Sequence, residues 1–290
     1  MPLLHIGAYE WLDFPVYPDT ILLSIFLLAA YLYAINYLRP HITDAARVPR
    51  RQIFSFTLGV AVFYAASGTP ITELSEEYLA SVHMFQHLLY TMVMAPLLLA
   101  GVPSWLWQAL LLRNARVRHV AAFFTRPLVA FSLFNTVLVL THLPSAVDLA
   151  LEVHGFHFFV HITLVVSALI MWWPILSPLS ELPRLSYPLQ MGYLFLQSVL
   201  PAVIASFVTF SDRVVYEFYG EAPRIWGLTA IHDQQIAGAV MKVMGSIILW
   251  YFITVAFFRW YSKEQAQEHG LKWQDVEREL DELGLKREGQ

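Results

Sequence analysis

Residues 79–100 read LASVHMFQHLLYTMVMAPLLLA, a stretch that contains no Asp, Glu, Lys or Arg. About 20 consecutive apolar residues are enough for an α-helix to cross the hydrocarbon core of a bilayer. The whole chain has the same character, because 57% of its 290 residues are hydrophobic and only 14% are charged. Soluble domains have roughly 45–50% apolar and about 25% charged residues. The sequence therefore predicts an all-α, polytopic membrane helix bundle.

Six further stretches are similarly apolar, and only the last of them contains a charged residue, Lys242. They are residues 20–38, 53–67, 128–141, 157–176, 187–210 and 234–258. Together with residues 79–100 they make seven candidate spans. The stretch 53–67 is the weakest, because it is short for a span and needs its polar flanks or a thinner bilayer to cross.

The distribution of Lys and Arg supports all seven spans and gives them an orientation. With the N-terminus outside, 15 of the 18 basic residues fall in cytoplasmic segments, and only Arg213 and Arg224 fall in external ones. Cytoplasmic loops of membrane proteins carry such an excess of Lys and Arg. Without the span at 53–67, 11 basic residues would lie outside and 6 inside. We therefore expect seven transmembrane helices, with the N-terminus outside and the C-terminus in the cytoplasm.

Both ends of the chain differ from the membrane region. The segment before the first span carries Glu10 and Asp13 but no Lys or Arg, so it lacks the basic start of a cleavable signal peptide. We expect the first span to be permanent. After residue 261 the chain becomes strongly charged, with apolar residues at helical spacing. The sequence predicts a seven-span membrane domain over residues 1–261 and a charged, helical cytoplasmic tail over residues 262–290.

Tryptophan residues gather at the predicted cytoplasmic ends of the spans. They are Trp105, Trp107, Trp172, Trp173 and Trp260. Tryptophan is enriched where a membrane meets water, because its ring is apolar and its N–H is polar. We expect these residues to form an interfacial belt.

Composition excludes several classes of site and partner. The chain has no cysteine, so disulfides, thiolate metal sites and iron–sulfur clusters are excluded. Its net charge of -4 gives no broad basic field, so we expect no nucleic-acid partner. Any bound metal must be held by His, Met, carboxylate or backbone groups.

Two histidine pairs lie near the predicted external ends of their spans. His83 and His87 form the motif HMFQH, and His157 and His161 form HFFVH. Residues four apart on an α-helix point to the same side, so each pair has the spacing of a metal chelate. Both helices run from outside to inside in the seven-span topology. The two pairs are therefore expected in the outer half of the membrane.

Further polar residues are expected at the same membrane level. His142 ends the fourth span, His154 lies one turn before His157, and His232 and Asp233 begin the seventh span. Polar and ionisable groups inside a membrane are costly and commonly functional. We interpret this group as a metal site. Interhelical hydrogen bonding without a metal, haem binding and a proton relay are the alternatives.

The residue types narrow the choice of metal. Imidazole suits Zn, Cu, Fe and Ni, whereas thioether sulfur selects Cu(I). Met94 shares a helical face with the pair at His83 and His87, and Met241 and Met244 follow Asp233 along the last span. Such a line of sulfur atoms would suit copper. Methionine is also common packing material, so the role of these side chains stays open.

Five ordered motifs resemble a known family. They are HMFQHLL with the following APLLL and GVP (83–103), THLPSAVD (141–148), HFFVHITLVVSALIMWWPIL (157–176), SYPLQMGYLFLQ (186–197) and DQQIAGAVMKV (233–243). Together they resemble the multi-span CtaG family of cytochrome c oxidase assembly factors, found in bacteria with haem–copper oxidases. Lys242 departs from the expected pattern, which puts the deep part of any metal path in doubt.

The resemblance implies a location, a role and a set of site residues. It implies a non-enzymatic protein of the bacterial plasma membrane that assists assembly of a haem–copper oxidase, with copper as the cofactor bound and supplied at the external face. The implied partners are oxidase subunits of the respiratory chain and an external copper chaperone. By motif, the implied metal ligands are His83, His87, His142, His157, His161 and Asp233.

Two other functions are compatible with the same residues. A seven-span zinc-dependent hydrolase would need three protein ligands, an open coordination position and a carboxylate that moves protons. His83, His87, His161 and Asp233 could supply these groups. A b-type haem protein would place axial histidines from two helices on either side of the iron.

Overall fold

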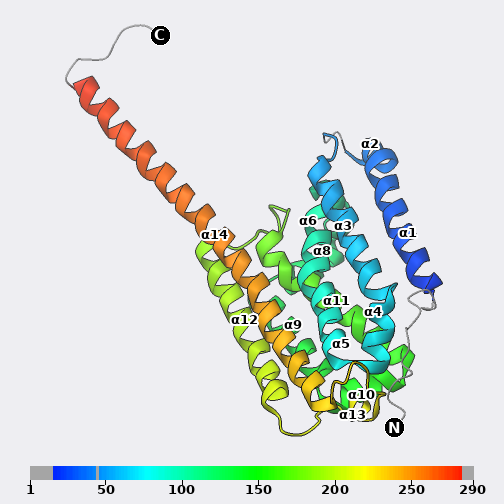
Figure 1. Ribbon diagram of the computed structural model, residues 1–290. Coiled ribbons are helices and arrows are strands. Elements are labelled where there is room, and N and C mark those ends of the chain that lie inside the picture. The colour runs from blue at the N-terminus through cyan, green and yellow to red at the C-terminus, as the bar shows by residue number, and fades with distance from the viewer. Residues whose placement is uncertain (1–15, 44–45, 283–290) are drawn as a thin grey trace.

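The computed structural model describes residues 16–43 and 46–282 (Figure 1). These residues form helices joined by loops, and no strand occurs among them. The all-α expectation is therefore confirmed. The segment with Glu10 and Asp13 and the end of the tail, residues 283–290, lie outside the described residues, and the expectations made for them stay predictions.

Five helical stretches are long and apolar enough to cross a bilayer. They are Pro18–Ile42, Ala80–Gly101, α11 (His154–Leu176), α12 (Tyr187–Phe210) and the part of α14 (Ala230–Glu282) up to Gln267. Each of them overlaps one of the spans expected from the sequence.

The other two expected spans are shorter helices next to a bend. α3 (Arg50–Ser67) is followed at an angle of 47° by α4 (Pro70–Glu73) and η2 (Leu74–Tyr78). α9 (Pro127–Thr141) is preceded at 73° by α8 (Ala115–Phe124). The 15 residues of α9 extend about 22 Å, less than the roughly 30 Å of a hydrocarbon core. The described residues thus contain five spans, or up to seven if each bent pair counts as one, so the predicted seven is the upper limit.

Two of the long stretches contain π-helical turns just before a proline. The first stretch consists of α1 (Pro18–Tyr33), the π-helical η1 (Ala34–Leu38) and α2 (Arg39–Ile42), which contains Pro40. The second consists of α5 (Ala80–Leu88), the π-helical η3 (Leu89–Met94) and α6 (Ala95–Gly101), which contains Pro96. Proline lacks an N–H and interrupts regular helical hydrogen bonding, which a widened turn accommodates.

Pro96 explains the position of a buried tryptophan. In η3 the N–H of Ala95 bonds to the carbonyl of Tyr90, five residues earlier. The corresponding donor to the carbonyl of Thr91 would be residue 96, which has no N–H. Trp172 Nε1 donates to this carbonyl instead, at 2.8 Å.

This burial contradicts part of the expected interfacial belt. Trp172 is fully buried, and Trp105 and Trp173 are also buried. Trp173 Nε1 donates to the carbonyl of Leu182. The assignment of these three residues to a belt was wrong, because their indole rings fill the space between helices.

Beyond α2 and α4, further short helices lie in segments expected to be connections between spans. They are α7 (Ser104–Leu111), α8, α10 (Pro144–Glu152) and α13 (Glu217–Glu221). Asn114 caps α8 by accepting hydrogen bonds from the N–H groups of Arg116 and Val117. Pro144 opens α10, where its missing N–H costs no helical hydrogen bond.

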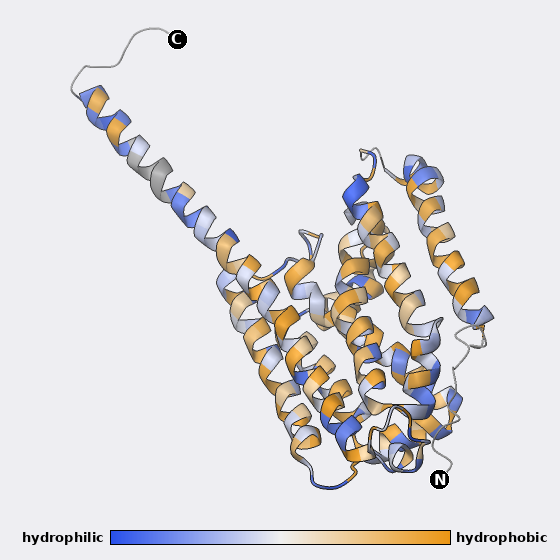
Figure 2. Cartoon of the chain, in the orientation of Figure 1, coloured by the Kyte–Doolittle hydropathy of each residue, from blue (hydrophilic) through white to orange (hydrophobic). Residues whose placement is uncertain are grey.

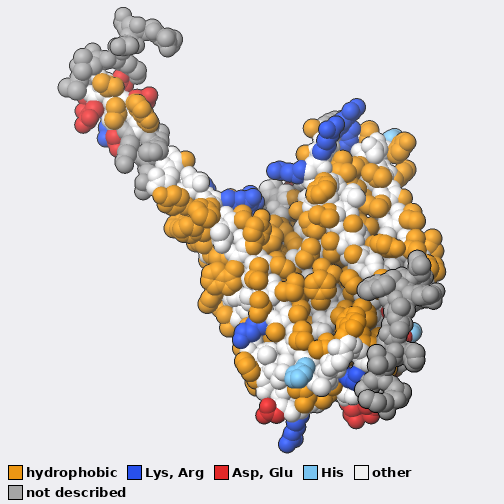
Figure 3. Space-filling model, in the orientation of Figure 1, with side chains coloured by type: hydrophobic (Ala, Val, Ile, Leu, Met, Phe, Trp, Pro, Cys, Tyr) orange, Lys and Arg blue, Asp and Glu red, His pale blue; other side chains and the backbone are white. Residues whose placement is uncertain are grey.

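The bundle has two different ends. α4, α10 and α13 gather at one end, and the connection from α2 to α3 lies at the other (Figure 1). The long helices between them are predominantly apolar (Figure 2). Most Lys and Arg side chains visible on the bundle lie at the end with the α2–α3 connection (Figure 3). The sequence predicts that this end is cytoplasmic, and the orientation stays a prediction.

The last helix extends beyond the bundle. α14 continues without interruption from Ala230 to Glu282, and its second half projects away from the other helices (Figure 1). The described part of the tail is therefore helical. The predicted domain boundary at residue 261 falls inside this one helix, so the separation of the tail as a domain stays a prediction.

Candidate metal centre

α5 and α11 bring the two histidine pairs together. Ring centroids are 4.3 Å apart for His83 and His87 on α5, and 4.2 Å apart for His157 and His161 on α11. Between the helices, the ring of His83 lies 5.6 Å from that of His157, and the ring of His87 lies 5.1 Å from that of His161. We call these residues the four-histidine cluster.

The Nε2 atoms of three of these rings converge. His161 Nε2 lies 3.0 Å from His157 Nε2 and 3.2 Å from His87 Nε2. In a neutral imidazole this nitrogen is one donor or one acceptor, so it cannot make a good hydrogen bond to both neighbours. Nitrogens bound to one tetrahedral ion at 2.0–2.1 Å are about 3.3 Å apart. Each of the two contacts of His161 therefore has the spacing of two ligands on one ion.

His83 belongs to the same arrangement. One ring nitrogen from each of His83, His157 and His161 lies within 4.8 Å of the other two. The Nδ1 atoms of His83 and His87 are buried and have no hydrogen-bond partner. Buried polar atoms normally have a partner, and these two have none among the described residues. In His87 it is the other ring nitrogen, Nε2, that contacts His161.

His142 lies beside the cluster at the end of α9. Its ring centroid is 5.5 Å from that of His87, and the side chain is buried. Its Nδ1 lies 2.8 Å from the carbonyl oxygen of Leu138, which requires this nitrogen to be the donor. Nε2 is then the nitrogen with a lone pair. His142 is thus placed as a fifth imidazole next to the cluster.

Asp233 has a different set of contacts. Its Oδ2 accepts a hydrogen bond from the backbone N–H of Ala80 at 2.7 Å, and its Oδ1 accepts from the backbone N–H and the hydroxyl of Ser81. A carboxylate at a helix N-terminus satisfies free N–H groups and interacts favourably with the helix dipole. Asp233 therefore fixes the first turn of α5, which positions His83. Its role as a metal ligand stays a prediction.

Glu76 is a neighbour of the cluster that the sequence analysis missed. Its Oε1 lies 3.5 Å from His157 Nδ1, and its side chain is 31% exposed. The residue lies in η2, a segment read as part of a loop, so no helical spacing linked it to the histidines. His154 and His232 are exposed and lie outside the cluster.

Comparison with known proteins identifies the family. Residues 29–263 match the family described as cytochrome c oxidase caa3 assembly factor (Caa3_CtaG). The chain belongs to this family. The resemblance inferred from the five motifs is thereby confirmed, and the matched region contains the four-histidine cluster, His142 and Asp233.

Two curated proteins are also relatives of this chain. They are Uncharacterized protein Mb0105 of Mycobacterium bovis (strain ATCC BAA-935 / AF2122/97) and Uncharacterized protein MT0111 of Mycobacterium tuberculosis (strain CDC 1551 / Oshkosh). Each is 23% identical over 236 residues, which cover 75% of this chain and 35% of the relative. The chain thus spans about a third of the length of these relatives. No solved structure matches it.

In this chain, α13 covers the cluster at the end of the bundle. The ring of Tyr219 lies 6.2 Å from that of His83, and its hydroxyl donates to the carbonyl of Ser75 at 2.5 Å. Burial, followed by the charge of nearby Asp233, raises the pKa of Tyr219 well above its usual value, so the phenol keeps its proton. The N–H of Phe218 donates to Asp148 on α10. These bonds tie η2, α10 and α13 together over the histidines.

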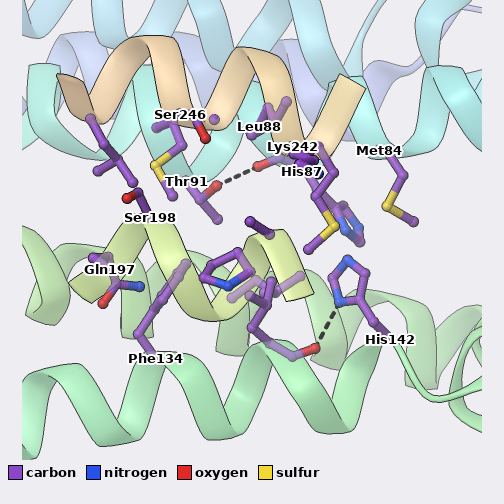
Figure 4. A pocket seen from close by; sticks show the side chains of 18 residues that line it. Met84, His87, Leu88, Thr91, Phe134, His142, Gln197, Ser198, Lys242 and Ser246 are labelled. Atoms are coloured by element: carbon purple, nitrogen blue, oxygen red, sulfur yellow. Dashed lines mark hydrogen bonds between the residues drawn. The ribbon is translucent and has the colours of Figure 1, made fainter. Parts of the chain in front are cut away.

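A small cavity lies beside His87 and His142 (Figure 4). Its volume of about 40 Å³ has room for about two or three water molecules. Its polar lining includes Thr91, Gln197, Ser198, Lys242 and Ser246, and its sulfur atoms come from Met84, Met92 and Met241. Gln197 accepts a hydrogen bond from Asn135, but its buried Nε2 has no partner among the described residues.

The other two methionines considered from the sequence do not line this cavity. Met94 packs with Ala66 and Tyr90 in an apolar cluster, and Met244 is 37% exposed on the outside of α14. Their environment is that of packing or lipid-facing side chains.

Proposed function

We propose that this assembly factor binds a copper ion through the four-histidine cluster and supplies it to a haem–copper oxidase during assembly. The observation that carries the proposal is that His161 Nε2 contacts two other imidazole nitrogens, His157 Nε2 at 3.0 Å and His87 Nε2 at 3.2 Å. Neutral imidazole is a good ligand for copper in either oxidation state. The family membership supports the link to the oxidase.

Several features support a transfer role. The imidazoles of the cluster come from two helices, α5 and α11. His142, at the end of a third helix, lies next to His87 and would take over the ion as it leaves the cluster. A cargo ion must leave as well as bind, and a ligand at a helix end can shift with the backbone. The cavity with three thioether side chains next to His87 adds groups that favour Cu(I).

The electrostatics at this end of the bundle also favour a cation. A hollow there is lined by five carboxylate side chains, those of Glu77, Asp148, Glu152, Glu217 and Glu221. Carboxylates grouped in a hollow raise the local concentration of cations. In the predicted orientation this end faces the outside, so the proposed route begins at the external face of a bacterial plasma membrane. An external copper chaperone would meet the protein here.

The two alternative functions find less support. A haem does not fit the space beside the histidines, because the cavity there is about 40 Å³ and the imidazole nitrogens are in mutual contact. A zinc hydrolase would need a free carboxylate, and Asp233 is engaged as the cap of α5. The other carboxylate beside the cluster, Glu76, lies 3.5 Å from His157 Nδ1 in an ion pair. We propose a non-catalytic role because the family is one of assembly factors.

Elemental analysis of the detergent-purified protein tests metal binding. We expect copper in the parent protein and its loss in the double variant His83→Ala/His87→Ala. His232→Ala is the matched control, since this histidine is exposed at the same end but outside the cluster. Copper retained by the double variant would overturn the proposal. Zinc with turnover of a lipid amide would favour the hydrolase, and a Soret band would favour haem.

Copper content of the oxidase tests the delivery role. In cells grown with little copper, the double variant should lower the copper content and activity of the oxidase, while its own abundance in the membrane stays unchanged. Excess copper should restore part of the activity, because mass action loads a weakened site. Normal oxidase copper in a strain with a stable double variant would refute delivery.

A further inference from the structure

Lys242 places a charge on the lipid-facing side of α14. The residue is exposed and lies in the part of α14 that is long enough to cross a bilayer. It follows Asp233 by nine positions, which is about 14 Å along the helix axis and close to half the thickness of a hydrocarbon core. Charged residues at this depth are costly and are commonly paired with another polar group.

The contacts of Lys242 leave most of its ammonium group unused. Nζ donates to Ser206 Oγ at 3.2 Å and lies 5.9 Å from the centroid of the Phe210 ring. An ammonium has three N–H donors. No ion pair joins Lys242 to a carboxylate among the described residues.

An open groove between α12 and α14 lies next to this ammonium. Its volume is about 850 Å³, and Phe195, Phe207 and Trp250 contribute aromatic rings to its walls. Ser198, Ala202 and Ser206 line it from α12 at a spacing of four residues. Small residues on a membrane helix allow another helix to approach closely. The groove therefore has the shape and polarity of a helix-docking surface.

The same groove borders the cavity at the histidines. Ser198, Ala202 and Ser246 line both the groove and the cavity that contacts His87 and His142. These residues thus form the wall between the two. An occupant of the groove would lie directly across this wall from the proposed copper ligands.

We propose that the α12–α14 groove binds a transmembrane helix of the client oxidase, and that this helix places a carboxylate against Lys242. The identity of the client rests on the proposed function. Charge complementarity selects the occupant, because an unpaired ammonium inside a membrane attracts an acidic side chain at the same depth. A lipid phosphate lies outside the hydrocarbon core, at least about 15 Å from the depth of this group.

Photocrosslinking in membranes that contain both the assembly factor and its oxidase tests the docking surface. A benzoyl-phenylalanine replaces Phe207, which lines the groove and is 76% exposed, or Phe158, which is 66% exposed on α11 and serves as the matched control. We expect an adduct with an oxidase subunit from position 207 only. Mass spectrometry should place the adduct on a transmembrane segment that contains Asp or Glu.

Variants of Lys242 test the charge pair. Lys242→Met should lower the adduct yield at least tenfold, and Lys242→Arg should preserve it. Ala202→Phe, which fills the groove without removing the charge, should also abolish the adduct. Lys242→Glu should lose the adduct and regain it when the acidic residue of the client is changed to Lys.

Three outcomes would overturn the docking proposal. They are equal adducts from positions 207 and 158, adducts with lipid alone, and an unchanged yield in Lys242→Met. The protein with benzoyl-phenylalanine at position 207, which lines the groove but not the cavity beside His87, should contain as much copper as the parent. Failure of docking is thereby distinguished from failure of copper binding, which only the histidine variants report.

Discussion

Replacing His161 by Ala removes the nitrogen on which the four-histidine cluster converges. His161 Nε2 makes both of the short nitrogen contacts, to His157 and to His87, so the variant leaves these two rings without a shared neighbour. Loss of a group that only orients a metal ligand costs about 10–100-fold in affinity. Loss of the central ligand should therefore cost at least about 100-fold, or about 2.7 kcal/mol.

Competition with a chromophoric Cu(I) chelator measures this loss on the detergent-purified protein. His142→Ala is the informative comparison, because its ring is 5.5 Å from that of His87 and its Nδ1 is held by the carbonyl of Leu138. We expect this variant to weaken copper binding less than about tenfold. An affinity for His161→Ala within threefold of the parent would refute the convergence argument. A larger loss of copper affinity in His142→Ala than in His161→Ala would indicate that the ion binds beside His87 and His142, next to the cavity.

Three further predictions concern the groups that hold the site in place. Asp233→Asn removes one oxygen acceptor from the first turn of α5, so it should lower stability by about 1–3 kcal/mol in thermal unfolding but retain copper. Tyr219→Phe removes the hydroxyl that donates to the buried carbonyl of Ser75. It should lower stability by a similar amount and make the segment around α13 more sensitive to proteolysis. Gly238→Ala should destabilise by about 1–3 kcal/mol, since its Cβ would lie 2.7 Å from the carbonyl oxygen of Ala205 on α12. Gly192→Ala, which meets nothing within 4 Å, should leave the melting temperature unchanged or raise it.

The main elements of the candidate site follow from local rules. The spacing of four places each histidine pair on one side of its helix, and the apolar stretches place both pairs at the same level of the bundle. Neither inference depends on how the helices pack. The sequence could therefore predict a polar group at one end of the bundle before any contact between α5 and α11 was known.

Features that depend on packing between distant segments were missed. Glu76 approaches His157 because η2 folds over the cluster, and no periodic pattern links the two residues. Trp172 is buried because it replaces the donor that Pro96 lacks, a relation between residues on different helices. Asp233 shared a level with the histidines, but only the structure shows its bonds to the start of α5. Hydropathy also could not detect the bends next to α3 and α9.

α14 connects the proposed copper site to the proposed docking groove. Asp233, in the first turn of α14, holds the N–H groups of Ala80 and Ser81 and so fixes the turn of α5 that precedes His83. Nine residues later on the same helix, Lys242 contacts Ser206 and Phe210, which line the groove. A docked partner that displaced α14 would act on the first turn of α5 through the hydrogen bonds of Asp233. Binding of the oxidase at the groove would then act on the histidine positions through two elements that are hydrogen-bonded to each other, which gives a physical reason for copper release to depend on the presence of the client.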